Sequence, residues 1–382
     1  NGTDGKDGAD GAVSFVVDDG IKETATLTLQ LLNKYKDLKL TYAIITNRLA
    51  TLQTETNNGV ANYVMLDGKY VYTVHADTIL FWKNILSSAG GRAELISHTN
   101  SHAFWGTNDD GGVFEYVDSQ GNLLTSSNMP VGSVTAEIIA SNQILMEQFG
   151  SRGLTHVVPG IMVKTTDTII GDKTIVTYDT YYQQLLSDCI ADGTLAGVRG
   201  NTFGTTSNYT GYVTTKDSIA RTGVPSLMIR LTDDPTSWCN YIDKAEEMNG
   251  LAVFCIHQII PDGTNGSGHY VYQSMAEELF SHALEKNLWI ANYTEATLYF
   301  TEWSTASVES VYEDGMIKVT LTDEEDNSFF DEPLTVKISV PATWTSAQLN
   351  GETLTVRKDA SGNRFVYVNI VPDSGVQYIT AA

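Results

Sequence analysis

Short apolar runs alternate with amphipathic stretches along the first three quarters of the chain. AVSFVV, at residues 12–17, is rich in β-branched residues and ends in Asp-Asp-Gly, which is typical of a buried strand that runs into a loop. Residues 24–38 carry leucines at helical spacing, and a second apolar run, LTYAIIT, follows at residues 40–46. A strand, a helix and a strand in so short a span predict a βαβ unit and a parallel sheet.

The same alternation continues to about residue 293. Further strands are expected at 93–97, 155–159, 225–231, 251–257 and 288–293, and further helices at 77–89, 135–150, 181–192, 237–248 and 273–287. About seven such repeats favour a closed or nearly closed (β/α) barrel. An open doubly wound sheet is the alternative, because periodicity does not show whether a sheet closes.

The pattern differs at the two ends of the chain and in one insertion. Glycine recurs at every third position in residues 1–11, a collagen-like period that is too short for a triple helix and predicts a hydrophilic tether. Residues 12–303 form the predicted barrel. Residues 304–382 alternate apolar and polar side chains, which predicts a small all-β sandwich as an accessory domain. The polar insertion 106–132 predicts a β-hairpin around the turn at 118–122.

Charge and composition disfavour some classes of binding partner and bear on where the protein acts. The chain carries 46 acidic and 23 basic residues, a net charge of −23, which disfavours nucleic acid and anionic lipid as partners. No apolar run reaches the roughly 20 residues that a membrane-spanning helix needs, and the first residues lack the features of a signal peptide. We therefore expect a trimmed, secreted or surface-tethered protein whose export signal lies upstream. No pattern predicts the oligomeric state.

Polar residues of one chemical kind follow three of the predicted strands. Asp18 and Asp19 follow the first strand, His98 and His102 follow the strand at 93–97, and His257 ends the strand at 251–257. Carboxyl ends of parallel strands form the usual active-site rim of such folds. Each group alone is weak evidence for a functional site. Asp-Asp-Gly commonly forms a loop, and the histidines of an HxxxH pair commonly lie on the solvated face of a helix. Their joint placement on one rim predicts a site.

This combination of residues suits metal-assisted hydrolysis. Histidines at i and i+4 face the same way when helical, and two imidazoles with one carboxylate leave coordination positions open. Zn²⁺ fits this ligand set best, and Co²⁺, Ni²⁺ or Mn²⁺ are alternatives. A second carboxylate can accept a proton from water, and a histidine opposite can protonate the leaving group.

The order FVVDDG, SHTNSH, VVPG and FCIH resembles the polysaccharide deacetylase family, also called carbohydrate esterase family four or the NodB homology domain. The resemblance covers about residues 12–300 and implies a distorted (β/α) barrel. It implies that Asp18 is the general base and that His257 is the general acid. It implies that the metal ligands are Asp19, His98 and His102. It also implies one bound divalent metal and a polysaccharide or oligosaccharide substrate. Asn100 and Ser101, within the second motif, are expected to be filler.

The chain departs from the family where an Arg-Pro-Pro-Tyr-Gly type segment is usual. HVVPGIM stands there, with Pro159 and Gly160 but without an arginine that would orient the base. Arg199 could reach the base from a neighbouring strand, although an ordinary surface role is the favoured interpretation. Trp105, Pro159, Gly160 and Arg199 are the candidate substrate-binding residues, and Tyr116 in the insertion is a weaker one.

Two further features concern the predicted acid, His257. Cys255 replaces an apolar residue of the family, which predicts an altered pocket for the acetate methyl group. An aspartate that tunes the acid histidine is expected near Trp238, and three positions remain candidates: Asp233, Asp234 and Asp243. The remaining histidines have no partner pattern and are expected to be bystanders: His75, His156, His269 and His282.

These features predict a metal-dependent enzyme that hydrolyses acetyl groups from a polysaccharide. An O-acetylated glycan of the xylan type is slightly preferred over N-acetylated chitin or peptidoglycan. Two alternatives remain open. One is a hydrolase of another amide or ester on the same metal site, and the other is a glycan-binding protein whose catalytic power has decayed, which the missing arginine suggests.

Overall fold

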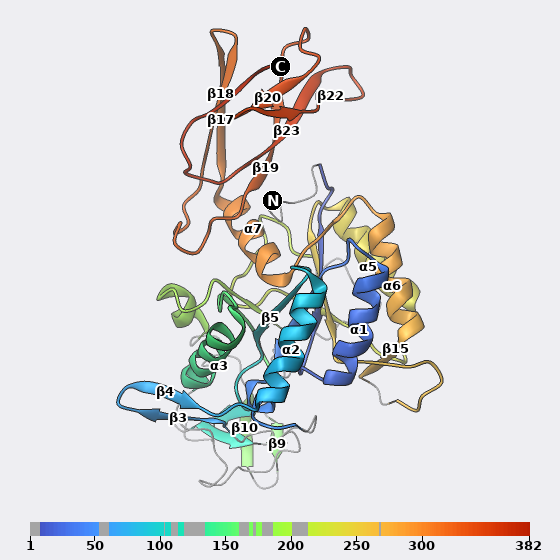
Figure 1. Cartoon of the computed structure of the whole chain (residues 1–382), viewed down its shortest axis with the longest axis vertical. Helices are drawn as coiled ribbons and strands as arrows, with labels where there is room; N and C mark the ends of the chain where they lie inside the picture. The colour runs from blue at the N-terminus through green and yellow to red at the C-terminus, as the bar shows by residue number, and fades with distance from the viewer. Residues whose placement is uncertain are drawn as a thin grey trace.

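The computed structural model describes residues 8–52, 61–102, 104–107, 114–117, 134–159, 168–170, 173–177, 186–200, 213–266 and 269–382. An α/β unit and a β-rich unit lie end to end, with helix α7 (Tyr293–Thr305) where they meet (Figure 1). Within the described ranges, no helix is both long and apolar enough to cross a membrane.

A parallel sheet forms the centre of the α/β unit. Its strand order is β11 (Gly197–Arg199), β8 (Thr155–Val157), β5 (Ala93–Ser97), β2 (Leu40–Ile44), β1 (Ala12–Val17), β13 (Leu251–Ile256) and β12 (Leu227–Met228), and β16 (Trp289–Ile290) also pairs with β1. All six residues of β1 are buried, as its unbroken apolar run predicts for a central parallel strand. Its register aligns Val17 with Ile256 of β13, so both strands end at the same rim.

The two edges of this sheet meet. Arg199 in β11 forms a parallel bridge with Val224, which lies just before β12. The Val224 amide donates to the Val198 carbonyl at 2.8 Å, and the Gly200 amide donates to the Val224 carbonyl at 2.9 Å. The predicted (β/α) barrel is therefore confirmed, in a distorted form that closes through one short segment.

Helices cover the outer face of the sheet, and α7 closes one end. Val13, Phe15 and Val17 of β1 belong to a core shared with the outer helices, which are α1 (Lys22–Lys34), α2 (Ala76–Ala89), α3 (Val134–Phe149), α5 (Pro235–Glu247) and α6 (Gln273–Glu285). Ala12 and Val16 point the opposite way, into a second core that includes residues of α7. The end of the barrel opposite α7 is where β1, β5 and β13 finish.

One local prediction was wrong. The strand expected at 288–293 ends at Ile290, and α7 begins at Tyr293 because Glu295 accepts a hydrogen bond from the Asn292 amide and stabilises a helix start there. Within the polar insertion, β6 (Phe104–Thr107) pairs antiparallel with β7 (Phe114–Val117). Residues 118–122 lie outside the described ranges.

Two small antiparallel pairings flank the predicted site end of the barrel. Strands β3 (Tyr63–Leu66) and β4 (Lys69–Tyr72) form a hairpin that the sequence pattern did not predict. Strand β10 (Lys173–Thr177) pairs with both β6 and β9 (Thr168–Ile170). Near the barrel, β14 (Gln258–Ile260) continues from the predicted acid histidine and pairs with β15 (Tyr270–Tyr272).

The C-terminal unit consists of two antiparallel sheets over one apolar core, as predicted. The larger sheet contains β17 (Ser307–Glu313), β18 (Met316–Thr322), β24 (Gln377–Ala381), β20 (Ala347–Leu349) and β21 (Glu352–Leu354), and the smaller contains β19 (Leu334–Ser339), β23 (Arg364–Ile370) and β22 (Arg357–Lys358). Residues from both sheets share that core. The division at residues 303 and 304 stays a prediction, and α7 runs across it. Of the predicted tether, residues 1–7 lie outside the described ranges.

The buried carboxyl group of Glu302, in α7, should make the stability of the chain depend on pH. Its side chain is fully buried, and burial, followed by the charge of Asp323, raises its pKa to about 9. Because the folded-state pKa lies above the ordinary 4.5, the stabilisation from the neutral acid is complete below 4.5 and is lost as pH rises toward 9. Glu302→Gln should therefore unfold at a higher denaturant concentration than the wild type at pH 8. The difference between the two unfolding midpoints should shrink at pH 5. A difference that stays the same between pH 5 and pH 8 would contradict the raised pKa of Glu302.

Candidate metal centre

The first motif is a sharp turn that directly follows β1. The Asp18 amide donates to the Ile256 carbonyl at 2.8 Å, so Asp18 extends the strand by one residue. Asp19 (φ 73°) and Gly20 (φ 67°) then adopt left-handed conformations. Aspartate tolerates this region better than most residues with a side chain, and glycine adopts it freely. The turn places two adjacent carboxylates at the rim, with Asp18 fully buried and Asp19 partly accessible.

The second motif is a compact turn and not a helix. His98 follows β5, and its amide donates to the Ile44 carbonyl at 3.0 Å. Thr99 (φ 63°) and His102 (φ 53°) are left-handed, and the His102 amide donates to Thr99 Oγ1 at 3.0 Å. The expectation that helical geometry aligns the two histidines was wrong. A strained turn brings their rings to a centroid distance of 4.8 Å instead.

Asn100 and Ser101 anchor this turn, so the expectation that they are filler was also wrong. The Asn100 amide group donates to Thr46 Oγ1 at 2.9 Å. Ser101 donates through both its amide (2.7 Å) and its hydroxyl (2.9 Å) to Glu137 Oε2. Burial raises the pKa of Glu137 to about 7 even though these hydrogen bonds favour its charged form. Sequence reasoning missed Glu137, because nothing in its helix pattern distinguishes it from a solvent-facing glutamate.

Asp19, His98 and His102 converge on one point. Asp19 Oδ1 lies 3.7 Å from His98 Nε2 and 3.6 Å from His102 Nε2, and the three candidate ligand atoms lie within 4.8 Å of one another. Tetrahedral bonds of about 2.0–2.1 Å place ligand atoms about 3.3 Å apart, so a small closing movement suffices to hold zinc. The expected ligand set therefore comes together in space.

The state of the two imidazoles also fits a metal ion. His98 Nδ1 lies 2.9 Å from the Val157 carbonyl oxygen, which orients the ring and leaves Nε2 facing Asp19. Burial, with a smaller contribution from His102, holds the pKa of His98 well below its ordinary value. Burial likewise lowers the pKa of His102, although Asp19 opposes this effect. Neutral imidazoles are the form that binds metals.

Arg199 pairs with Asp18 inside the barrel. Its Nη1 and Nη2 donate to the two carboxylate oxygens at 2.8 and 2.6 Å, and both side chains are fully buried. Burial disfavours the guanidinium charge, but the Asp18 carboxylate outweighs it and raises the pKa of Arg199. The favoured interpretation of Arg199 as a surface residue was wrong. The arginine absent from HVVPGIM has a counterpart on the next strand, β11.

Cys255 and His257 also lie close to Asp18. Cys255 Sγ is 3.3 Å from Asp18 Oδ2 and 3.7 Å from His257 Nδ1. Burial raises the pKa of Cys255 well above its ordinary value, so this cysteine remains a thiol. Asp18, Cys255 and His257 form a second group of possible ligands. Because the Arg199 charge already occupies Asp18, this group suits a cation less well than the first one does.

Two presumed bystanders lie close to the site. The His269 ring is 5.4 Å from that of His257, and burial followed by His257 lowers the pKa of His269. His156 is buried, with Nδ1 3.0 Å from Ser97 Oγ at the end of β5, and burial followed by Arg199 lowers its pKa to about 3. His282 pairs instead with Asp243 at 2.7 Å, on the outer helices.

The other candidates are less informative. Trp105 lies in β6 opposite Tyr116 in β7, Pro159 is buried after β8, and Gly160 lies outside the described ranges. Of the aspartates near Trp238, Asp243 pairs with His282 and Lys286, and Asp234 caps α5 by accepting from the Thr236 amide. Asp233 accepts from the Arg230 amide at 2.8 Å, in the loop after β12.

Sequence reasoning also missed Arg48. It belongs to the short 3-10 helix η1 (Thr46–Ala50) that follows β2, and its Nη1 donates to the Asp19 carbonyl oxygen. Nothing in TNRLA signals this contact, because it depends on how η1 folds back over the rim.

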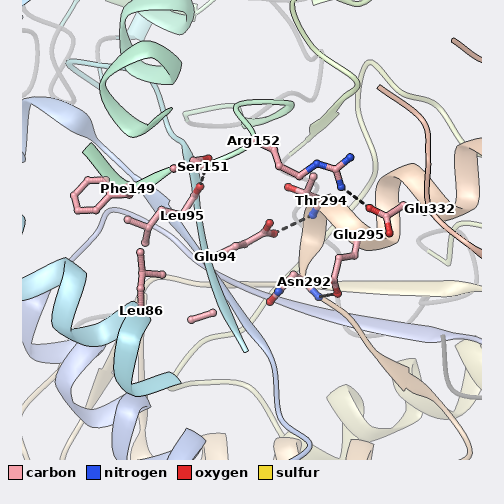
Figure 2. A pocket seen from close by; sticks show the side chains of 12 residues that line it. Leu86, Glu94, Leu95, Phe149, Ser151, Arg152, Asn292, Thr294, Glu295 and Glu332 are labelled. Atoms are coloured by element: carbon pink, nitrogen blue, oxygen red, sulfur yellow. Dashed lines mark hydrogen bonds and ion pairs between the residues drawn. The ribbon is translucent and has the colours of Figure 1, made fainter. Parts of the chain in front are cut away.

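A cavity of about 340 Å³ lies elsewhere in the molecule (Figure 2). It is lined at the start of β5 by Glu94 and on the α7 side by Thr294 and Glu295. Glu94 Oε1 accepts from the Thr294 amide at 2.9 Å, and Arg152 pairs with Glu332 across the opening. None of the predicted site residues lines this cavity, so we assign it a structural role.

Comparisons with known proteins find similarity to parts of this chain and to its overall architecture. No family model matches the chain. A gellan lyase from Bacillus sp is 35% identical over 92 residues, which are 23% of this chain and 4% of that protein. The chain thus spans only a small part of the length of this curated relative.

Solved structures similar to this chain include deacetylase-type proteins. BA3943 from Bacillus anthracis, a CE4 family pseudoenzyme, is 10% identical with a TM-score of 0.37 over 75% of this chain and 65% of that chain. The BpsB deacetylase domain from Bordetella bronchiseptica is 16% identical with a TM-score of 0.31 over 56% of this chain and 69% of that chain. The first belongs to the family that the DDG and HTNSH motifs resemble.

The buried pair of Arg199 and Asp18 yields a stability prediction. Arg199→Met leaves an uncompensated carboxylate in the barrel, which should lower the free energy of unfolding by about 3–5 kcal/mol. The double variant Asp18→Asn, Arg199→Met removes both charges and should recover part of this loss. Urea unfolding of the wild type and the three variants, including Asp18→Asn alone, gives the comparison. Equal losses in Arg199→Met and the double variant would show that the charges are not coupled.

Proposed function

We propose that this protein is a metal-dependent hydrolase that removes acetyl groups from a polysaccharide. One observation carries the proposal: Asp19, His98 and His102 converge beside a second carboxylate, Asp18, that is buried and held by an arginine. A purely structural cluster has no need to bury two neutral imidazoles next to two adjacent aspartates, because each buried polar group costs free energy.

Asp19, His98 and His102 would hold the ion, with Zn²⁺ favoured and Co²⁺, Ni²⁺ or Mn²⁺ as alternatives. When bound, such an ion supplies Lewis acidity that polarises an acetyl carbonyl and acidifies water. Both imidazoles are held neutral by burial, so binding requires no proton release from them. Burial alone would raise the pKa of Asp19, but its interactions with the neighbouring histidines and Arg48 outweigh burial and lower the pKa, so Asp19 keeps its charge.

The remaining residues provide proton transfer. Asp18 would act as general base and accept a proton from the attacking water at a carboxylate oxygen. Arg199 fixes the orientation of that carboxylate through two parallel hydrogen bonds. His257, which lies near Asp18, would act as general acid and donate a proton to the departing sugar oxygen or nitrogen.

We further propose an external glycan as the substrate. An O-acetylated glycan of the xylan type remains slightly preferred over chitin or peptidoglycan, for a protein that is secreted or tethered at the cell surface. Trp105 and Tyr116, opposite each other in the β6–β7 hairpin, are the candidate sugar-contacting residues. Cys255 takes the place of an apolar side chain near the acetyl position, so the pocket accepts the methyl group beside a thiol.

The alternatives lose part of their support. A decayed binding protein was suggested by the missing arginine, and the pairing of Arg199 with Asp18 removes that reason. The same metal site would also serve hydrolysis of a different amide or ester, because the ligands and the proton-transfer pair do not distinguish these bonds.

Acetate release distinguishes these functions. Metal-stripped protein should release little acetate from acetylated xylan or chitooligosaccharide, and reloading with zinc or cobalt should restore release from at least one of them. Asp18→Asn should lower kcat/KM by about 10²–10⁴-fold, because it removes the base and leaves the ligands in place. Unchanged glycan binding without any acetate release by the wild type would favour the binding protein, and metal binding without release from either substrate would favour another bond.

A further inference from the structure

The 3-10 helix η1 lies between the two turns that carry the candidate ligands. The Thr46 amide donates to the Thr99 carbonyl at 3.2 Å, and the Asn47 amide donates to the Asn100 carbonyl at 2.8 Å. Asn100 returns a side-chain bond to Thr46 Oγ1. One face of η1 is therefore fixed to the turn that holds His98 and His102.

Arg48 extends from η1 to the other turn. Its Nη1 donates to the carbonyl oxygen of Asp19, the residue whose backbone is left-handed. A carbonyl in such a turn has no strand or helix partner, so the guanidinium satisfies a group that the turn exposes. Through Arg48, the Asp-Asp-Gly turn is tied to η1, and through η1 it is tied to the HTNSH turn.

We propose that Arg48 is a positioning residue that holds Asp19 in register with His98 and His102 and thereby raises the affinity of the site for its metal ion. The inference rests on the proposed metal site. It adds to that site a residue that lies outside the ligand motifs and comes from the loop after β2.

Two physical effects of Arg48 oppose each other, and this makes the inference testable. Its positive charge lies close enough to act on both Asp19 and His102, so charge alone would repel a cation. Its hydrogen bond fixes a strained turn, so geometry alone would favour binding. If positioning outweighs charge, removal of Arg48 weakens metal binding, and if charge outweighs positioning, removal strengthens it.

The experiment measures the zinc dissociation constant of the full chain by competition with a chromophoric chelator. Arg48→Met keeps the length of the side chain but removes the donor and the charge, and should weaken zinc binding by about 10–100-fold. Arg48→Lys keeps the charge and one point donor and should lie between Arg48→Met and the wild type. The absorption spectrum of the cobalt-loaded protein should also change in Arg48→Met, since a displaced Asp19 alters the ligand geometry.

Arg92 offers a matched control. Arg92 directly precedes β5, away from the rim. Its Nη1 also donates to backbone carbonyls, those of Leu32 and Tyr35 at the end of α1. Arg92→Met should lower stability without changing zinc affinity, and near-ultraviolet circular dichroism checks that each variant is folded. Zinc binding by Arg48→Met as tight as or tighter than that of the wild type would overturn the inference and leave the proposed function standing. Absence of zinc binding by the wild type would overturn both.

Discussion

A carboxylate buried beside a thiol and close to His98 needs a positive partner, and Arg199 supplies it for Asp18. In the sheet, β8, β5 and β2 separate the strand of Arg199 from the strand that precedes Asp18. The two side chains meet only because the sheet curls and its edges join through Val224. The ion pair and the closure of the barrel thus depend on each other, since an open sheet would leave both charges buried without a partner.

The rim is built from strained turns on a rigid support. Asp19, Thr99 and His102 are left-handed, and a β-branched residue such as Thr99 is rarely found in that region. Hydrogen bonds from the surroundings hold these turns in place. Arg48 donates to the Asp19 carbonyl and Ser141 donates to the Thr99 carbonyl. Glu137 accepts from the turn between the two histidines. Such strain persists only where the neighbouring structure determines it, which is common at functional sites. The β-sandwich lies at the other end of the barrel, beyond α7 (Figure 1).

The sequence predicted the scaffold better than the details of the site. Buried strands such as 12–17 and 251–256 are unbroken apolar runs, and the carboxyl ends of parallel strands place Asp19, His98 and His102 together without further information. The geometry of the HxxxH turn was not predictable, because five residues cannot show that Thr99 leaves the helical region. Arg199 and Arg48 act across long separations in the chain, and their partners are decided by the curvature of the sheet and the path of η1. Glu137 sits in an ordinary helical pattern, and only its burial reveals its role.

The most direct test of the proposed metal centre is anomalous diffraction at the zinc edge from crystals grown with zinc. We expect one ion within about 2.0–2.2 Å of a carboxylate oxygen of Asp19 and of Nε2 in both His98 and His102. An ion bound instead by Asp18, Cys255 and His257, or no ion at either group, would contradict it.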